Sequence, residues 1–92
     1  MTSAEATIKN KYGIHCRPST VIAKELQSFK SKVTVHTSDG TEAAAVNVLQ
    51  IMGLALTCGD TVTISADGPD EKAACKRAVE LFEQHFEYVP GE

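Results

Sequence analysis

The stretch Gly13-Ile14-His15-Cys16-Arg17-Pro18-Ser19 places a histidine where a loop gives way to a helix. Proline is tolerated only in the first turn of a helix, so Pro18 predicts a helix that begins near residue 16. Apolar residues at i, i+4 and i+7 then form one face of that helix: Ile22, Leu26 and Phe29. Packing gives no reason for this order of residues around His15, whereas the handling of phosphate does.

The rest of the chain alternates predicted strands and helices. Alternating apolar and polar residues predict three clear strands and a weaker, alanine-rich return strand after the turn Ser38-Asp39-Gly40: residues 4–10, 32–37, 61–66 and, for the weak one, 41–46. Asn47, a good N-cap residue, opens a short apolar helix through residue 56. A last helix follows the turn at 67–71, with its apolar stripe at Cys75, Val79, Phe82 and Phe86.

The order strand, helix, strand, strand, helix, strand, helix (βαββαβα) predicts the fold class. Helices packed on one face of a mostly antiparallel sheet make an α+β sandwich. The chain has 92 residues, which suffices for one domain with one modest core. We therefore expect a single domain over residues 1–92, in which about residues 88–92 form a loose tail.

The charge of the chain argues against some partners and favours others. The net charge is -3, which is not expected of a protein that binds nucleic acid. The charge is uneven, because residues 1–46 carry six basic and four acidic side chains, whereas residues 47–92 carry three and eight. The half that contains His15 is thus the one that favours an anion.

The cysteines and the apolar runs indicate a compartment. Cys16, Cys58 and Cys75 are widely spaced and form no CxxC pair, so we expect neither a metal site nor a disulfide framework. We expect Cys58 in a turn and Cys75 in the core, as free thiols that suit a reducing environment. The N-terminus lacks the pattern of a signal peptide, and no apolar stretch could span a bilayer. We therefore expect a cytoplasmic protein without membrane insertion.

The chemistry of the junction follows from its place at a helix start. An imidazole there faces the positive end of the helix dipole and unpaired backbone N–H groups. If His15 carried a phosphoryl group, the amides of Cys16 and Arg17 could bind its oxygens, and the Arg17 guanidinium would add charge and paired donors. The dipole also disfavours the imidazolium, which leaves a ring nitrogen free to attack phosphorus. His15 is therefore a candidate phosphoryl acceptor, and nothing in the sequence calls for a cofactor.

The motif at residues 13–19 resembles the active-site signature of HPr, the histidine-containing phosphocarrier of the bacterial phosphoenolpyruvate-dependent phosphotransferase system. The resemblance covers nearly the whole chain, including the apolar run at 46–56 and the strand at 61–66. It implies an open-faced β-sandwich, with a four-stranded antiparallel sheet and three helices on one face, in a single HPr-like domain. It also implies phosphorylation of His15 by phospho-enzyme I, at Nδ1 rather than Nε2, and transfer to enzyme IIA domains for sugar uptake. Arg17 would assist phosphoryl binding and transfer.

The same resemblance implies a docking surface and a carrier role. In the family an apolar second helix docks on enzyme I and enzyme IIA, and Val48, Leu49 and Met52 match that surface. Exposed apolar patches often mark partner contacts, although these three residues could instead belong to the core. The protein would then act as a monomeric carrier with a phosphohistidine intermediate, rather than as a stand-alone enzyme.

Two features depart from the family pattern. Many members carry a regulatory serine at the start of the second helix, where alignment places either Asn47 or Gln50. Neither residue can be phosphorylated, so regulation by the dedicated kinase is not expected. Cys16 stands where the family often has Ala or Thr, and Ser19 where it often has Ala. Both are small enough to fit, and Ser19 is expected as a polar first-turn residue rather than a ligand.

Other functions stay open at this point. A related carrier could signal to nitrogen or carbon metabolism without feeding sugar transport. From a different class, the apolar second helix could belong to a protein-binding module in which His15 is never phosphorylated. A lone histidine is usually structural or solvated, and we interpret His36, on the polar face of a strand, and His85, near the end of the last helix, in that way.

Overall fold

The computed structural model of the protein describes residues 1–10, 14 and 16–84, without the side chains of Cys16 and Arg17. Four strands and three helices follow one another in this part of the chain: β1 (Thr2–Thr7), α1 (Cys16–Leu26), β2 (Lys32–His36), β3 (Glu42–Ala44), α2 (Val48–Gly53), β4 (Thr61–Asp67) and α3 (Glu71–Glu83). The predicted βαββαβα order is confirmed. Residues 11–13 and 15 lie outside the described residues, as do His85, Phe86 and the expected tail.

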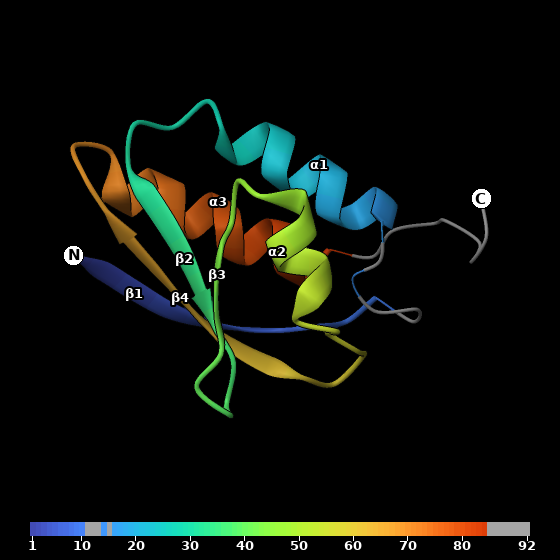
Figure 1. Cartoon of the computed structure of the whole chain (residues 1–92). Helices are drawn as coiled ribbons and strands as arrows, with labels where there is room; N and C mark the ends of the chain where they lie inside the picture. The colour runs from blue at the N-terminus through green and yellow to red at the C-terminus, as the bar shows by residue number, and fades with distance from the viewer. Residues whose placement is uncertain (11–13, 15, 85–92) are drawn as a thin grey trace.

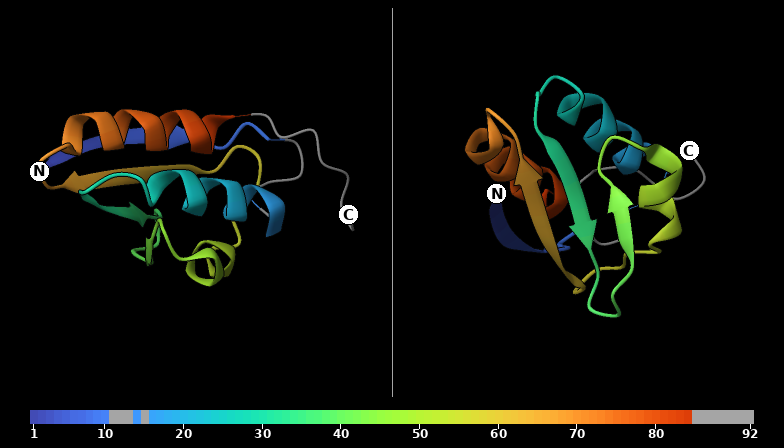
Figure 2. Two further views of the ribbon diagram at one scale, coloured as in Figure 1. Left: turned by 90° about the horizontal axis from the view of Figure 1, so that it is seen from above. Right: turned by 60° about the vertical axis from the view of Figure 1, so that its left-hand side comes forward.

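The strands form one antiparallel sheet in the order β1-β4-β2-β3. The helices lie against one face of this sheet and leave the other face uncovered (Figure 1, Figure 2). α3 packs on β1 and β4, α1 lies beside α3, and α2 contacts both α1 and the edge strand β3. This arrangement is the open-faced β-sandwich predicted above.

The central strand β4 shows why the sheet has one buried face and one solvent-exposed face. Val62, Ile64 and Ala66 are buried, while the residues between them are partly or wholly exposed. On the two neighbouring strands, Ala4 and Val35 stand opposite Ile64. A strand that alternates in this way buries one side against the helices and turns the other to water.

One apolar core lies between the sheet and the helices, and each described helix contributes to it. The large apolar side chains with the least exposure are Phe82, Ile8, Ile22, Leu26, Ile51, Ile64, Leu81, Val35 and Val62. Full burial of one such side chain contributes about 1.5–3 kcal/mol, so this set dominates the stability of the fold. In the part of the chain that the structure describes, no helix combines the length and hydropathy needed to cross a bilayer.

The predicted helix stripes are largely confirmed. Ile22 and Leu26 of α1 are buried, whereas Phe29 lies beyond the end of the helix and is half-buried. On α3, the stripe is wider than the sequence indicated, because two alanines and a leucine join Cys75 and Phe82 in the core: Ala74, Ala78 and Leu81. The same helix carries Val79 at the margin of the core.

The second helix is shorter than predicted. It ends at Gly53 rather than at residue 56, and the N–H of Leu54 then donates back to the carbonyl of Ile51 at 3.1 Å. Ala55 has a φ of 52°, the left-handed conformation that ends a helical ladder. The apolar run therefore continues past the helix as a loop that leads to the buried Leu56.

Two strand boundaries also differ from the prediction. The first strand spans Thr2–Thr7 rather than residues 4–10, although the N–H of Ile8 still donates to the carbonyl of Asp60 at 2.8 Å. The return strand contains only Glu42–Ala44, because the chain turns toward α2 directly after it. The turn between β2 and β3 lies where the sequence placed it, with Gly40 at a φ of 90° that favours glycine.

Candidate functional site

The junction that carries His15 lies directly before α1. α1 begins at Cys16, as the sequence predicted, and has 11 residues. On the other side, Ile14 is buried, and its N–H donates a 3.1 Å hydrogen bond to the carbonyl of Leu56. His15 itself and the side chains of Cys16 and Arg17 lie outside the description. The backbone is thus held on both sides of the histidine.

The first turn of α1 is suited to a negatively charged group. The first N–H groups of a helix have no partner within the helix, and the helix dipole adds partial positive charge there. Cys16 and Arg17 are the first two residues of α1, so their amides belong to this set. The first turn contains no acidic residue that would neutralise it. An anion bound next to His15 would meet these donors.

Ser19, which was expected as a polar first-turn residue rather than a ligand, lies inside the molecule. Its exposed fraction is 0%, and its hydroxyl oxygen has no hydrogen-bond partner among the described residues. The expectation that a small side chain fits at this position agrees with the packing. The hydroxyl faces the core, so it is not placed to contact a ligand from solvent.

The start of α2 carries the cap that the sequence predicted. Asn47 Oδ1 accepts a 3.1 Å hydrogen bond from the N–H of Gln50, which satisfies one of the free donors of the helix start. Gln50 Oε1 in turn accepts a 2.8 Å hydrogen bond from the N–H of Ala44 on β3. Both residues that alignment offered for the regulatory serine are therefore structural partners in this chain.

The apolar residues of α2 divide between the core and the surface. Ile51 is completely buried and Val48 is partly buried against the core. Leu49 is 80% exposed, and Met52 is 38% exposed. The sequence did not single out Val46, which is 42% exposed and precedes the helix. We call the exposed or partly exposed residues Val46, Val48, Leu49 and Met52 the α2 patch.

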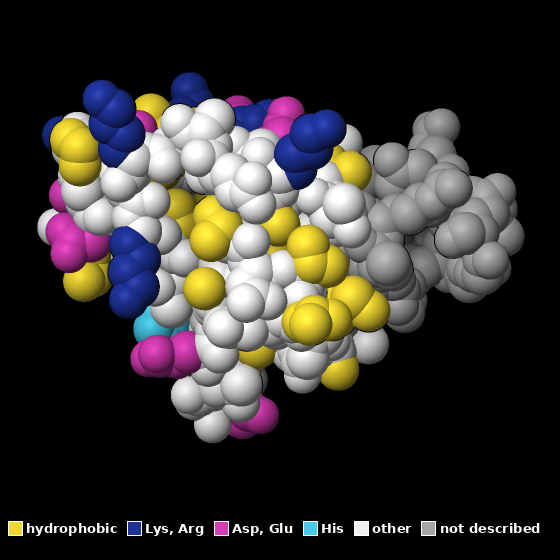
Figure 3. All heavy atoms as spheres, turned by 45° about the horizontal axis from the view of Figure 1, so that its top comes forward, with side chains coloured by type: hydrophobic (Ala, Val, Ile, Leu, Met, Phe, Trp, Pro, Cys, Tyr) yellow, Lys and Arg dark blue, Asp and Glu magenta, His cyan; other side chains and the backbone are white. Residues whose placement is uncertain are grey.

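The α2 patch continues toward the junction. A hollow of about 260 Å³ is lined by Ile14, Met52, Ala55, Leu56 and Thr57, so the end of α2 meets the residue that precedes His15. Figure 3 shows hydrophobic side chains, drawn in yellow, that gather on the face of the molecule it displays. Sequence reasoning missed the last three of these lining residues, because only the fold brings their loop beside Ile14.

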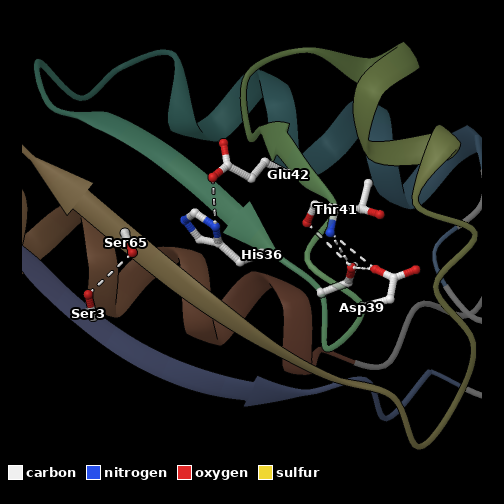
Figure 4. A network of polar contacts seen from close by, with 7 residues as sticks. Ser3, His36, Asp39, Thr41, Glu42 and Ser65 are labelled. Atoms are coloured by element: carbon white, nitrogen blue, oxygen red, sulfur yellow. Dashed lines mark hydrogen bonds and ion pairs between the residues drawn. The ribbon is translucent and has the colours of Figure 1, made fainter.

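Of the three histidines, only His36 is among the described residues. His36 is on β2 on the uncovered face of the sheet, where its Nδ1 lies 3.3 Å from Glu42 Oε1 (Figure 4). Ser3 and Ser65 share a 3.2 Å hydrogen bond on the same face. These contacts support the interpretation of His36 as a surface residue. His85 is not among the described residues.

The cysteines that the structure describes agree with their predicted roles. Cys58 is exposed in the turn before β4, and Cys75 is buried on α3. Burial raises the pKa of the Cys75 thiol, which makes its reactive thiolate scarcer. Within residues 1–10, 14 and 16–84, no group of three or more His, Cys, Asp and Glu side chains could hold a metal ion.

The chain resembles known proteins in both sequence and fold. Residues 2–84 match the family model described as the PTS HPr component phosphorylation site, a site of the phosphotransferase system (PTS). The match covers more than half of the chain, so the protein belongs to the HPr family of phosphocarriers.

Relatives in sequence and in structure agree with this assignment. The phosphocarrier protein HPr of Haemophilus influenzae is 42% identical over 81 residues, which cover 88% of this chain and 94% of that protein. The crystal structure of HPr-C-His from Thermoanaerobacter tengcongensis superposes with a TM-score of 0.82 at 33% identity, covering 89% of this chain and 91% of the other. The crystal structure of an HPr dimer from the same organism superposes with a TM-score of 0.67 at 34% identity, covering 88% of this chain and 92% of the other.

Proposed function

We propose that this protein is a phosphoryl carrier in which His15 accepts a phosphoryl group from phospho-enzyme I and passes it to enzyme IIA domains for sugar uptake. The observation that carries the proposal is the start of α1 at Cys16, directly after His15, in a chain of the HPr family. In that position the imidazole would lie beside the unpaired amides of a helix start. Enzyme I and enzyme IIA are therefore the partners that we expect.

The transfer needs little from the carrier beyond position and charge. The lone pair of His15 Nδ1 forms a bond to phosphorus while the bond between phosphorus and the donor breaks. The phosphoryl oxygens then meet the amides of Cys16 and Arg17, and the Arg17 guanidinium adds positive charge. A single arginine and one helix end would bind the phosphoryl group only weakly. The acceptor can then form its own bond to phosphorus while the bond between phosphorus and Nδ1 breaks.

Docking on these partners is assigned to the second helix. Val48, Leu49 and Met52 form the proposed contact, and their exposure on α2 supports it, since Leu49 is 80% exposed. We include Val46, which is 42% exposed, in this proposed surface. Because the hollow at Ile14 connects the patch with the junction, a partner on α2 would reach His15 as well.

Regulation through a serine kinase is not part of the proposed function. Asn47 and Gln50 stand at the candidate positions, and neither carries a hydroxyl that a kinase could phosphorylate. Both side chains are engaged in hydrogen bonds that hold the start of α2. Phosphorylation of His15 is then the switch that we assign to this chain.

The expected state of the protein completes the proposal. We propose that residues 1–92 act as one domain and as a monomer in the cytoplasm. The exposed thiol of Cys58 suits a reducing compartment. A relative has been crystallised as a dimer, so sedimentation of this chain across micromolar concentrations is the test, and one concentration-independent monomeric species is expected.

One labelling experiment tests the carrier. The protein is incubated with enzyme I and labelled phosphoenolpyruvate, beside the variants His15→Ala and His36→Ala. We expect an acid-labile, base-stable label on the wild type and on His36→Ala, and none on His15→Ala. An unlabelled wild type, with enzyme I shown to be phosphorylated, would favour the protein-binding module instead. Addition of enzyme IIA should then remove the label, whereas retention would point to a carrier that serves another acceptor.

A further inference from the structure

The side chain of Gln50 joins α2 to the free edge of the sheet. β3 is an edge strand, and its pairing with β2 leaves the backbone groups of Ala44 pointing away from the sheet. The N–H of Ala44 donates to Gln50 Oε1 at 2.8 Å, and the carbonyl of Ala44 accepts from the N–H of Asn47 at 3.0 Å. Both outward groups of this edge residue are therefore taken by the start of α2.

Asn47 and Gln50 are also hydrogen-bonded to each other. Asn47 Oδ1 accepts from the N–H of Gln50 at 3.1 Å, and the carbonyl of Asn47 accepts from the N–H of Ile51 at 3.1 Å. Ala44, Asn47 and Gln50 thus form a closed set of hydrogen bonds, which we call the α2 clamp. It connects the sheet edge to the first turn of the helix.

α2 depends on such a clamp because it cannot be stable alone. The helix has six residues, and Ile51 is its one fully buried side chain. Isolated helices shorter than about 12–15 residues are marginal in water, so tertiary contacts must hold this one. At its other end, the chain passes through Ala55 with its left-handed φ of 52°. Besides the packing of Ile51, the clamp therefore helps to fix the direction in which Leu49 projects.

We propose that Gln50 is a positioning residue that fixes the α2 patch for docking, a role that rests on the proposed carrier function. Gln50 does not itself belong to the patch. It holds the first turn of α2 against β3, so Val48, Leu49 and Met52 are ordered before a partner arrives. Without the clamp, the partner would have to order this turn on binding, which weakens association but leaves the chemistry at His15 unchanged.

Two substitutions at the same position separate the hydrogen bond from the size of the side chain. Gln50→Met keeps a long side chain but loses the oxygen that accepts from Ala44. Gln50→Glu keeps an acceptor oxygen at the same place, and measurement in enough salt screens its added charge. Gln27→Met serves as a matched control, because Gln27 is exposed in the turn after α1, at the opposite end of that helix from His15.

The first readout concerns the clamp and needs no partner. Hydrogen exchange of the Ala44 amide, followed by NMR, should be about 2- to 10-fold faster in Gln50→Met, the range expected for the loss of one hydrogen bond. Gln50→Glu and Gln27→Met should exchange as the wild type does. Unchanged exchange at Ala44 in Gln50→Met would overturn the clamp, whatever the protein does with enzyme I.

The second readout concerns docking. In steady-state phosphorylation by enzyme I, the KM for Gln50→Met should rise about 2- to 10-fold with kcat unchanged, and Gln50→Glu should restore the KM. Faster exchange at Ala44 with an unchanged KM would overturn the positioning role. A higher KM without faster exchange would also overturn it, since Gln50 would then contact the partner directly. A wild type that enzyme I cannot phosphorylate would refute the proposed function and the docking role together, while the exchange data would still decide the clamp.

Discussion

Ser19 is a polar residue enclosed by an apolar core. Its hydroxyl has no hydrogen-bond partner among the described residues, and its exposed fraction is 0%. A buried hydroxyl without a partner costs about 1–3 kcal/mol relative to one in water. We expect Ser19→Ala to raise the free energy of unfolding by about 1 kcal/mol, measured by urea denaturation. A lower stability would mean that the hydroxyl donates or accepts a hydrogen bond after all.

Ala55 is strained in a different way. It is the one non-glycine residue with a positive φ in the described part of the chain, at 52°. A residue with a side chain costs about 1–2 kcal/mol in the left-handed region, and glycine avoids this strain. Glycine also loses more conformational entropy on folding, which offsets part of the gain. Ala55→Gly should therefore stabilise the protein by up to about 1 kcal/mol. Thermal unfolding of the two proteins decides the question, and a lower melting temperature would contradict it.

Among the elements, the loop after α1 is joined to the start of α3 through one carboxylate. Asp70, the N-cap residue of α3, accepts hydrogen bonds from the Ser31 hydroxyl and from the N–H groups of Lys30 and Ser31 in the loop after α1. Gly68, with a φ of 152°, lies close to the same loop. A Cβ at this position would lie only 2.7 Å from the Ser31 Cα, so the close approach requires a glycine. The loop before α3 thus closes against the loop that leads into β2.

The contact gives a pH dependence with a definite sign. The Ser31 hydroxyl, followed by the Lys30 N–H, holds the pKa of Asp70 below its ordinary value. A carboxylate with a lowered pKa in the folded state stabilises the fold above the unfolded pKa, near pH 4, and less as the pH falls through the folded pKa. We expect Asp70→Asn to lower the urea midpoint at pH 7 and to flatten its fall below about pH 4. The exposed Asp67→Asn is the control, and an equal fall of its urea midpoint at pH 7 would contradict a specific role for Asp70.

The second helix has one side in the core and one side in water. Leu49 is 80% exposed, so Leu49→Ala should change the free energy of unfolding by less than about 0.5 kcal/mol. If the α2 patch docks on enzyme I, the same change should raise the KM about fivefold or more, as central interface residues do. Gln27→Ala is the neutral control. A KM equal to that of the wild type would remove Leu49 from the docking surface.

At the scale of the whole molecule, the elements with strong periodic patterns could be predicted from the sequence. β4 alternates valine, isoleucine and alanine with polar residues, and Pro18 marks the start of α1, so both were placed within a residue of their positions. The core face of α3 was incomplete, because Ala74 and Ala78 carry too little hydrophobicity to stand out in a pattern.

The candidate site was predictable only where it is continuous in the chain. The order of residues 13–19 indicated a helix start with a phosphate-handling histidine, and α1 begins there. The contact of Ile14 with Leu56 and the clamp of Gln50 on Ala44 join segments that the sequence does not relate to one another. Such contacts follow from packing of the whole fold, and local patterns carry no record of them.

The central claim is that His15 carries the phosphoryl group on Nδ1. The most direct test labels the histidine ring nitrogens with ¹⁵N and records their NMR signals before and after addition of enzyme I and phosphoenolpyruvate. We predict that the signals of one histidine change, that His15→Ala abolishes this change, and that the phosphorus is coupled to Nδ1. Phosphorylation at Nε2, at His36 or at His85, or no change with an active enzyme I, would contradict the account.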